Sequence, residues 1–284
     1  MSQSVHATGA LESSARAADS SLFRTGLLVI NADDWGRDRE TTDRILACVQ
    51  FGSVSAVSSM VFMEDSERAA ELACSSDMDA GLHLNLTSQF TAGNCDPRLT
   101  NHHHRVIRYL RSSRIARYVV NPFLRSSFEY VVRAQIDEYK RLYGAAPVRI
   151  DGHHHVHLSA NVQWQRLLPS GTHVRRNFSF TPGEKGRVNR LFRSRQDRRL
   201  ARRHHLDDLF FLLPPLEPIG RVERLVSYAT DHTVELETHP VNTDEFEFLT
   251  SPQLPALMER FHLPFPMASA KVRYSAEASP SSSA

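Results

Sequence analysis

The sequence predicts an α/β fold built on a largely parallel sheet or a barrel, and three observations support this prediction. Short apolar runs alternate along the chain with segments of helical periodicity. Several of these runs end abruptly in carboxylates, histidines or arginines. The 284 residues, of which 41% are hydrophobic and 23% charged, suit one globular domain with one sizeable core.

The first predicted strand is the apolar run 26–30, which ends in the polar residues 31–34. A helix is predicted over 38–51 because apolar residues recur there at helical spacing, and Gly52 is its stop signal. A second apolar run, 54–62, predicts the next strand.

Alternation of apolar and polar residues over 80–86 predicts a third strand, with its three leucines on one face and His83 on the other. The clearest helix is predicted over 127–143, where the apolar side chains form one stripe and Gly144 ends the pattern. Three more strands are predicted over 148–151, 172–176 and 233–238, and one more helix over 221–229.

Polar clusters lie at or near the carboxyl ends of these predicted strands. In parallel sheets and barrels the active site lies beyond those ends. The residues concerned are Asp33, Asp34, His83, the segment 151–157, Arg175, Arg176 and His239. Their position predicts that the protein is an enzyme.

Asp33 and Asp34 are adjacent, so in an extended strand their side chains point in different directions. One carboxylate could then face a metal ion while the other faces a water molecule or a substrate. Two neighbouring carboxylates also need a cation or a proton nearby, because like charges raise each other's pKa. The alternative interpretation is a pair of N-cap residues for the following helix.

His83 alone would more often be a hydrogen-bonded structural residue than a ligand. The segment 151–157, Asp-Gly-His-His-His-Val-His, supplies partners for it. Imidazole and carboxylate ligands together suit zinc, iron, nickel, cobalt or manganese, and less strictly magnesium. If the segment continued as a strand, His153, His155 and His157 would lie on one face of the strand and His154 on the other. In a loop this alternation would not hold.

His239 ends the predicted strand 233–238 and precedes a proline. A histidine titrates near neutral pH, so it is a natural general acid for a departing amine. The alternative is a turn histidine without a chemical role. The run 101–104, Asn-His-His-His, has no carboxylate and no strand context, and we interpret it as a surface or loop segment that could border the substrate entrance.

Nine basic residues and a single acid, Asp197, lie between Lys185 and Arg203. Most charge runs are solvated faces, but one this one-sided favours an anionic neighbour such as a phosphate, a nucleotide-sugar or an acidic membrane surface. The net charge of +2 selects no partner. The sequence has no glycine-rich phosphate loop and no nucleic-acid-binding module, so no nucleic-acid partner is expected.

Cysteine usage and the absence of long apolar runs predict a cytoplasmic protein. Cys48, Cys74 and Cys95 are too few and too irregularly spaced for a disulfide framework, which favours free thiols in a reducing compartment. No apolar stretch matches a secretory signal or a transmembrane helix. We expect disordered segments at 1–24 and 273–284, and one domain over 25–272 with a basic insertion at about 184–205.

Four short motifs occur in a fixed order along residues 26–242: Ile-Asn-Ala-Asp-Asp-Trp-Gly at 30–36, Gly-Leu-His at 81–83, Ile-Asp-Gly-His-His-His-Val-His at 150–157 and Thr-His-Pro at 238–240. This order resembles the YdjC-like carbohydrate deacetylase family, which includes diacetylchitobiose and hopanoid-associated deacetylases. The resemblance implies a distorted (β/α) barrel of the glycoside hydrolase/deacetylase type.

The resemblance also implies roles for individual residues. Asp34, His83 and His153 would bind one divalent ion, with Mg²⁺ or Zn²⁺ favoured and Mn²⁺, Co²⁺ or Ni²⁺ as alternatives. Asp33 would be the general base and His239 the general acid. Independently of the resemblance, Asp151, His155, His157 and Arg175 are candidates for orienting a ligand or contacting the substrate. Asp151 would orient a nearby ring, and Arg175 would hold Asp33 or the substrate.

The function implied is metal-dependent removal of an acetyl group from an N-acetylated amino sugar, which could also carry a phosphate, a nucleotide or a lipid. Trp35, Gly152 and Val241 depart from the family's usual Phe, Ser and Gly. The alternatives are a metal-dependent phosphoesterase using Asp33, Asp34 and Asp151, and a non-catalytic glycan-binding protein. A homodimer is compatible with this kind of fold, although no segment identifies an interface.

Overall fold

The computed structural model describes residues 26–180 and 186–263, and the predicted disordered segments 1–24 and 273–284 lie outside them. Seven parallel strands form one sheet in the order β5-β4-β3-β2-β1-β7-β6. The strands are β1 (Leu27–Trp35), β2 (Ala56–Ser59), β3 (Ala80–Leu84), β4 (Arg149–Gly152), β5 (His173–Val174), β6 (Leu209–Leu212) and β7 (Thr233–Thr238).

The sheet curls so that its two edge strands, β5 and β6, approach each other. His173 and His205 form a parallel bridge, in which the Val174 N–H donates to the His205 carbonyl at 2.9 Å. Further along, the Ser179 N–H donates to the Phe210 carbonyl at 2.7 Å. A few backbone hydrogen bonds therefore close the ring in place of a full strand pair, and the predicted distorted (β/α) barrel is confirmed.

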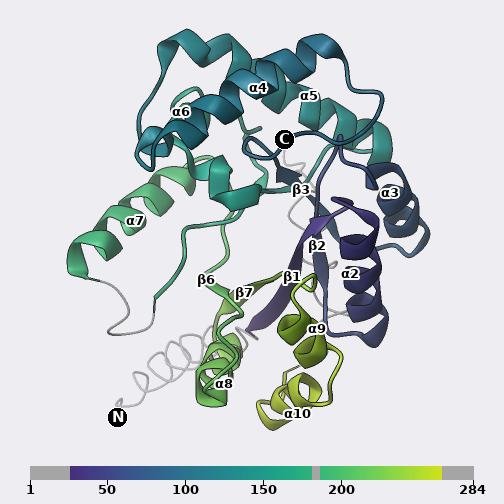
Figure 1. Cartoon of the computed structure of the whole chain (residues 1–284). Helices are drawn as coiled ribbons and strands as arrows, with labels where there is room; N and C mark the ends of the chain where they lie inside the picture. The colour runs from purple at the N-terminus through teal and green to yellow at the C-terminus, as the bar shows by residue number, and fades with distance from the viewer. Residues whose placement is uncertain (1–25, 181–185, 264–284) are drawn as a thin grey trace, which may run out of the picture.

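Helices cover the outside of this barrel (Figure 1). They are α2 (Arg39–Phe51), α3 (Ser66–Ser75), α4 (Pro97–Ser112), α5 (Arg125–Tyr143), α6 (Ala160–Trp164), α7 (Arg187–Leu200), α8 (Ile219–Ser227), α9 (Thr243–Leu249) and α10 (Gln253–Arg260). Short 3-10 helices lie at η1 (Ala116–Tyr118), η2 (Pro122–Leu124), η3 (His153–Leu158) and η4 (Tyr228–Thr230). Within the described ranges, every helix is too short or too polar to cross a bilayer.

Strand alternation separates an apolar outer face of the sheet from a polar inner face. On β1, Ile30 and Ala32 point outward into the apolar core, whereas Asn31 and Asp33 point inward and hydrogen bond to each other at 2.7 Å. One apolar cluster lies between β1, β2, β6, β7 and helices α2, α8, α9 and α10, and a second lies between β3, β4 and helices α4 and α5. The barrel interior is consequently free to hold charged side chains.

The two principal predicted helices are confirmed, and their end signals act as expected. The Asp38 side chain accepts a hydrogen bond from the Thr41 N–H at 2.8 Å and so caps α2. Gly52 and Gly144 end α2 and α5 in the left-handed conformation, with φ of 90° and 75°.

Several sequence-based predictions need correction. The predicted loop at 101–104 lies inside α4, where His103 is buried with Leu99, Val106 and Leu110 on one face. The three adjacent histidines hid this helical period because they lower the apolar content of the segment. The strand predicted over 172–176 is only two residues long, and the sequence predicted neither β6 nor the helix α7 in the basic segment.

Burial of His103 makes the fold sensitive to acid. Its Nε2 lies 3.2 Å from the Asn85 carbonyl oxygen, and its ring stacks on Phe90 at 3.7 Å. Burial lowers the pKa of His103 from 6.5 to about 4, so between these pH values the unfolded chain binds the proton that the folded chain excludes.

We expect the free energy of unfolding to fall as the pH falls from 7.5 to 5.5, with His103 contributing about 1 kcal/mol of that loss. The change His103→Gln should remove this share of the pH dependence, whereas His104→Gln on the exposed side of α4 should not. Urea denaturation at the two pH values measures the difference. Equal pH dependence in the wild type and in His103→Gln would contradict this account.

Candidate active site

A bulge at the end of β1 brings two adjacent carboxylates to one cavity. The pairing of β1 with β2 shifts register between Ala32 and Trp35, and Asp34 adopts a left-handed backbone with φ of 70°. Such a conformation is uncommon for a residue other than glycine and is typical of strained functional sites. Asp33 and Asp34 therefore line the same cavity rather than pointing in different directions, as a regular strand would require.

Asp34, His83 and His153 form a compact cluster whose ligand atoms all lie within 4.8 Å of one another. Asp34 Oδ1 lies 3.3 Å from His83 Nε2 and 2.9 Å from His153 Nδ1. Asp34 Oδ1 and His83 Nε2 are buried, yet neither forms a hydrogen bond of acceptable geometry with the described residues. Buried polar atoms in this state are those that a bound cation would satisfy.

Neighbouring side chains fix the orientation of this cluster. Asp151 Oδ1 lies 2.7 Å from Nδ1 of His83, which leaves Nε2 facing Asp34. Arg37 donates to Asp34 Oδ2 at 2.9 Å, and His153 Nε2 lies 3.1 Å from the Ser88 hydroxyl. A carboxylate that orients a histidine in this way is common behind the ligands of protein-bound metals.

Arg175 forms ion pairs with four carboxylates in the barrel interior. It donates to both oxygens of Asp33 at 2.7 Å, and it lies 2.8 Å from carboxylate oxygens of Asp151 and Glu235. Glu237 is 3.3 Å away. Burial raises the pKa of Asp33, but the charges of Arg175 and His83 and the hydrogen bond from Arg175 together outweigh burial, so the pKa lies below its usual range and Asp33 is ionised at neutral pH.

Glu235 and Glu237 alternate on β7 and face the same interior. Burial raises the pKa of Glu237 well above its ordinary value, and the negative charge of Asp33 raises it further. The pKa of Glu235 is also raised, again by burial first. One positive guanidinium therefore does not keep all four carboxylates ionised to the same degree.

His239 lies at the rim of the cavity, directly after β7. Its Nε2 is 3.9 Å from Glu237 Oε1, and its backbone N–H donates to Glu245 Oε2 at 2.9 Å. Glu245 also accepts from Thr238 and Asn242, which fixes the turn that carries the ring. The cavity, of about 470 Å³, is lined by Asp33, Asp34, Arg37, Arg117, His153, His154, His155, Glu237, His239, Val241 and Asn242.

The four histidines after β4 do not follow the alternation of a strand, because the chain turns into η3. His154 and His155 have left-handed backbones, with φ of 54° and 56°. His155 lines the cavity with His153, whereas His157 is fully buried, with Nε2 2.9 Å from the Arg175 carbonyl. A Cβ atom at Gly152 would meet the His157 nitrogen at 2.9 Å, so the turn packs too closely for a serine without a shift.

The sequence-based prediction missed Arg37, Arg117 and Glu237, all of which line the cavity. For two of them the sequence contains a pattern that could have indicated the cavity. Arg37 follows Asp34 by three residues, and Glu237 belongs to a strand in which acidic residues occupy alternate positions. Arg117 lies in η1, far from any motif, and nothing local to its sequence indicates the cavity.

The fold and the site together define a (β/α) barrel protein with an Asp-His-His cluster at the carboxyl ends of its strands. The family model described as YdjC-like protein matches residues 27–260. The chain therefore belongs to the YdjC-like family.

Curated relatives and one solved structure are similar to this chain. A mouse carbohydrate deacetylase is 31% identical over 48% of this chain and 44% of that protein, and a Serratia marcescens chitooligosaccharide deacetylase is 28% identical over 48% and 52%. The chain thus spans about half the length of the curated relatives it matches. An Enterococcus faecalis crystal structure, provisionally named a cellobiose-phosphate cleavage protein, shares the fold with a TM-score of 0.62, 20% identity and coverage of 84% of this chain and 96% of that one.

We expect loss of the Arg175 charge to destabilise the fold. The change Arg175→Met leaves buried carboxylates without their cation, which typically costs about 3–5 kcal/mol. Arg133→Met is the matched control, because its ion pair with Glu129 is exposed and worth less than about 1 kcal/mol. Urea denaturation gives both values. Equal stability of the two variants would contradict the role of Arg175 as the organising cation.

Proposed function

We propose that this protein is a metal-dependent deacetylase that hydrolyses the acetamide of an N-acetylated amino sugar. The observation that carries the proposal is the cluster of Asp34, His83 and His153, in which Asp34 and His83 each have an unsatisfied buried atom. Asp34 and His153 line the same cavity as Asp33 and His239. The names of the curated relatives, carbohydrate and chitooligosaccharide deacetylase, support the same reaction class.

The three side chains fit a divalent ion. Two imidazole nitrogens and one carboxylate oxygen form a donor set that zinc and other first-row metals accept, and it leaves coordination positions open. When bound, the ion would polarise the amide carbonyl and lower the pKa of a water molecule.

In this proposal, two residues that line the cavity transfer protons. Asp33, held ionised by Arg175, would accept a proton from the attacking water. His239, whose ring lies within 4.8 Å of a carboxylate oxygen of Asp33, would give a proton to the departing nitrogen. The C–N bond of the amide breaks as the water oxygen joins the acyl carbon, and the products are acetate and an amino sugar.

A phosphoesterase is less well supported, because two-metal chemistry needs further free carboxylates. Asp33 and Asp151 are both bound to Arg175, at 2.7 Å and 2.8 Å, and a second cation would have to compete with this guanidinium. We therefore propose a single ion per chain.

Replacement of the cluster and of the proposed base should separate metal binding from turnover. We expect Asp34→Ala to lose the bound metal together with activity. Asp33→Asn should keep about one ion per chain but release acetate at least about 100-fold more slowly, because general base catalysis contributes on this scale. Metal analysis and an acetate assay on a panel of N-acetylated sugars measure the two effects.

Glu64→Gln is a suitable control, since Glu64 is exposed and lies outside the cavity. Asp34→Ala with unchanged metal content and unchanged acetate release would refute the assignment of the cluster. A metal-loaded wild type that releases acetate from none of the sugars would refute the deacetylase itself.

A further inference from the structure

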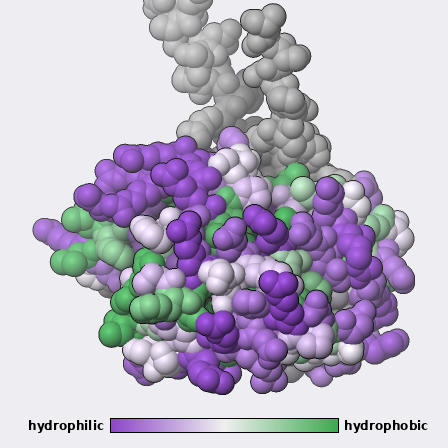
Figure 2. Space-filling model, turned by 90° about the horizontal axis from the view of Figure 1, so that it is seen from above, coloured by the Kyte–Doolittle hydropathy of each residue, from purple (hydrophilic) through white to green (hydrophobic). Residues whose placement is uncertain are grey.

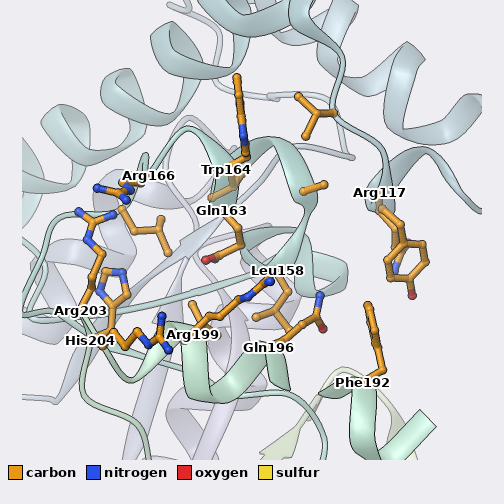
Figure 3. Close-up of a pocket in the computed structure, with 17 residues that line it drawn as sticks. Arg117, Leu158, Gln163, Trp164, Arg166, Phe192, Gln196, Arg199, Arg203 and His204 are labelled. Atoms are coloured by element: carbon orange, nitrogen blue, oxygen red, sulfur yellow. The ribbon is translucent and has the colours of Figure 1, made fainter. Parts of the chain in front are cut away.

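A second, larger cavity lies between α6, α7 and η1, outside the barrel (Figure 3). Its volume is about 1000 Å³, twice that of the cavity above the barrel. Figure 3 shows Arg166 and Arg203 at one end, and Arg117 and Phe192 at the other, with Gln163, Arg199 and Gln196 between them.

The lining of this cavity is strongly basic. It contains five arginines and no acidic residue among the described residues: Arg117, Arg166, Arg199, Arg202 and Arg203. None of these five makes an ion pair with a carboxylate in the part of the chain that the structure describes, although Arg203 donates to the Ser170 hydroxyl at 2.7 Å. By contrast, Arg68 and Arg141 elsewhere on the surface pair with acids.

Uncompensated guanidinium groups around one cavity repel each other, so an anionic ligand would stabilise them. The planar guanidinium binds phosphate oxygens through two parallel hydrogen bonds. Several arginines converging on one space therefore suit a phosphate or a diphosphate.

Apolar side chains form the outer rim of this cavity. Tyr118, Trp164 and Phe192 are exposed, and the rings of Tyr118 and Phe192 lie 6.4 Å apart. On α7, Val188 and Leu191 are also exposed. Figure 2 shows apolar surface towards the side of the molecule on which α7 lies in Figure 1. The rim could therefore hold an apolar or aromatic group attached to the phosphate.

Arg117 joins this cavity to the candidate active site. It lines both the cavity above Asp33 and Asp34 and the basic cavity beside α7. The two cavities therefore adjoin at Arg117, which is the arrangement that a sugar with an attached anion would need.

We propose that the basic cavity binds a phosphate or diphosphate group linked to the N-acetyl sugar, so that the substrate is an anionic glycoconjugate rather than a neutral oligosaccharide. This inference rests on the proposed deacetylase function for the position of the sugar. The basic segment thereby gains a role in substrate selection.

Binding and turnover are to be measured separately on the full, metal-loaded chain. The probes are N-acetylglucosamine, its 1-phosphate, its uridine diphosphate conjugate and its polyprenyl diphosphate conjugate in detergent. Calorimetry gives Kd for each probe, and acetate release gives KM and kcat. We expect the three phosphate-bearing probes to bind at least about 10-fold more tightly than the neutral sugar, because each charge-assisted hydrogen bond contributes on this scale.

Arg199→Gln and Arg166→Gln should each weaken binding of the phosphorylated probes by about 10-fold more than binding of the neutral sugar. Arg198→Gln is the matched control, because Arg198 neighbours Arg199 on α7 but lies outside the cavity. If the 1-phosphate binds as tightly as the conjugates, the cavity recognises the phosphate. If one conjugate binds more tightly, the apolar rim also contributes to binding.

Equal Kd values for the neutral and phosphorylated sugars, or equal losses in Arg199→Gln and Arg198→Gln, would overturn the inference. Acetate release from neutral sugars without a preference for phosphate would also overturn it, while leaving the deacetylase intact. Arginine-dependent binding of phosphorylated probes without acetate release would support the cavity and reject the deacetylase. The two proposals can therefore fail independently.

Discussion

The guanidinium of Arg175 lies at the centre of the barrel, within 3.3 Å of oxygens from Asp33, Asp151, Glu235 and Glu237. Three strands, β1, β4 and β7, and the segment after β5 meet around this one cation. Buried carboxylates at such separations would otherwise repel each other or take up protons. The arrangement of these carboxylates inside the barrel depends on the positive charge of Arg175. The position of the candidate metal cluster beside them therefore depends on it too.

The layer between the sheet and the surrounding helices is apolar, in contrast to the charged interior of the barrel. Apolar clusters between the sheet and the helices supply the hydrophobic stabilisation, so the interior does not need to be apolar. Each strand separates the two environments by alternation, as Ile30 and Asn31 do on β1 and Leu236 and Glu237 do on β7. A preorganised interior of this kind suits a site that must stabilise developing charge.

The helix α7 and the segment η1 extend the molecule beyond the barrel. Together with α6 they add a basic cavity that Arg117 joins to the barrel cavity. In the proposed function, the barrel would act on the amide and the added elements would select the remainder of the substrate. The family's motifs lie in the barrel, so substrate choice can vary in these peripheral helices without altering the central cluster.

The sequence by itself determined much of the architecture, because strand alternation, helical periodicity and glycine stop signals are local. The ends of α2 and α5 at Gly52 and Gly144, the common face of the leucines of β3, and the placement of polar residues at strand ends all followed from neighbours in the chain. The tertiary structure alone decided that a bulge brings Asp33 and Asp34 to the same cavity, that His157 is buried while His155 lines the cavity, and that Arg117 reaches the site. These outcomes depend on packing between residues distant in sequence, which no local pattern encodes.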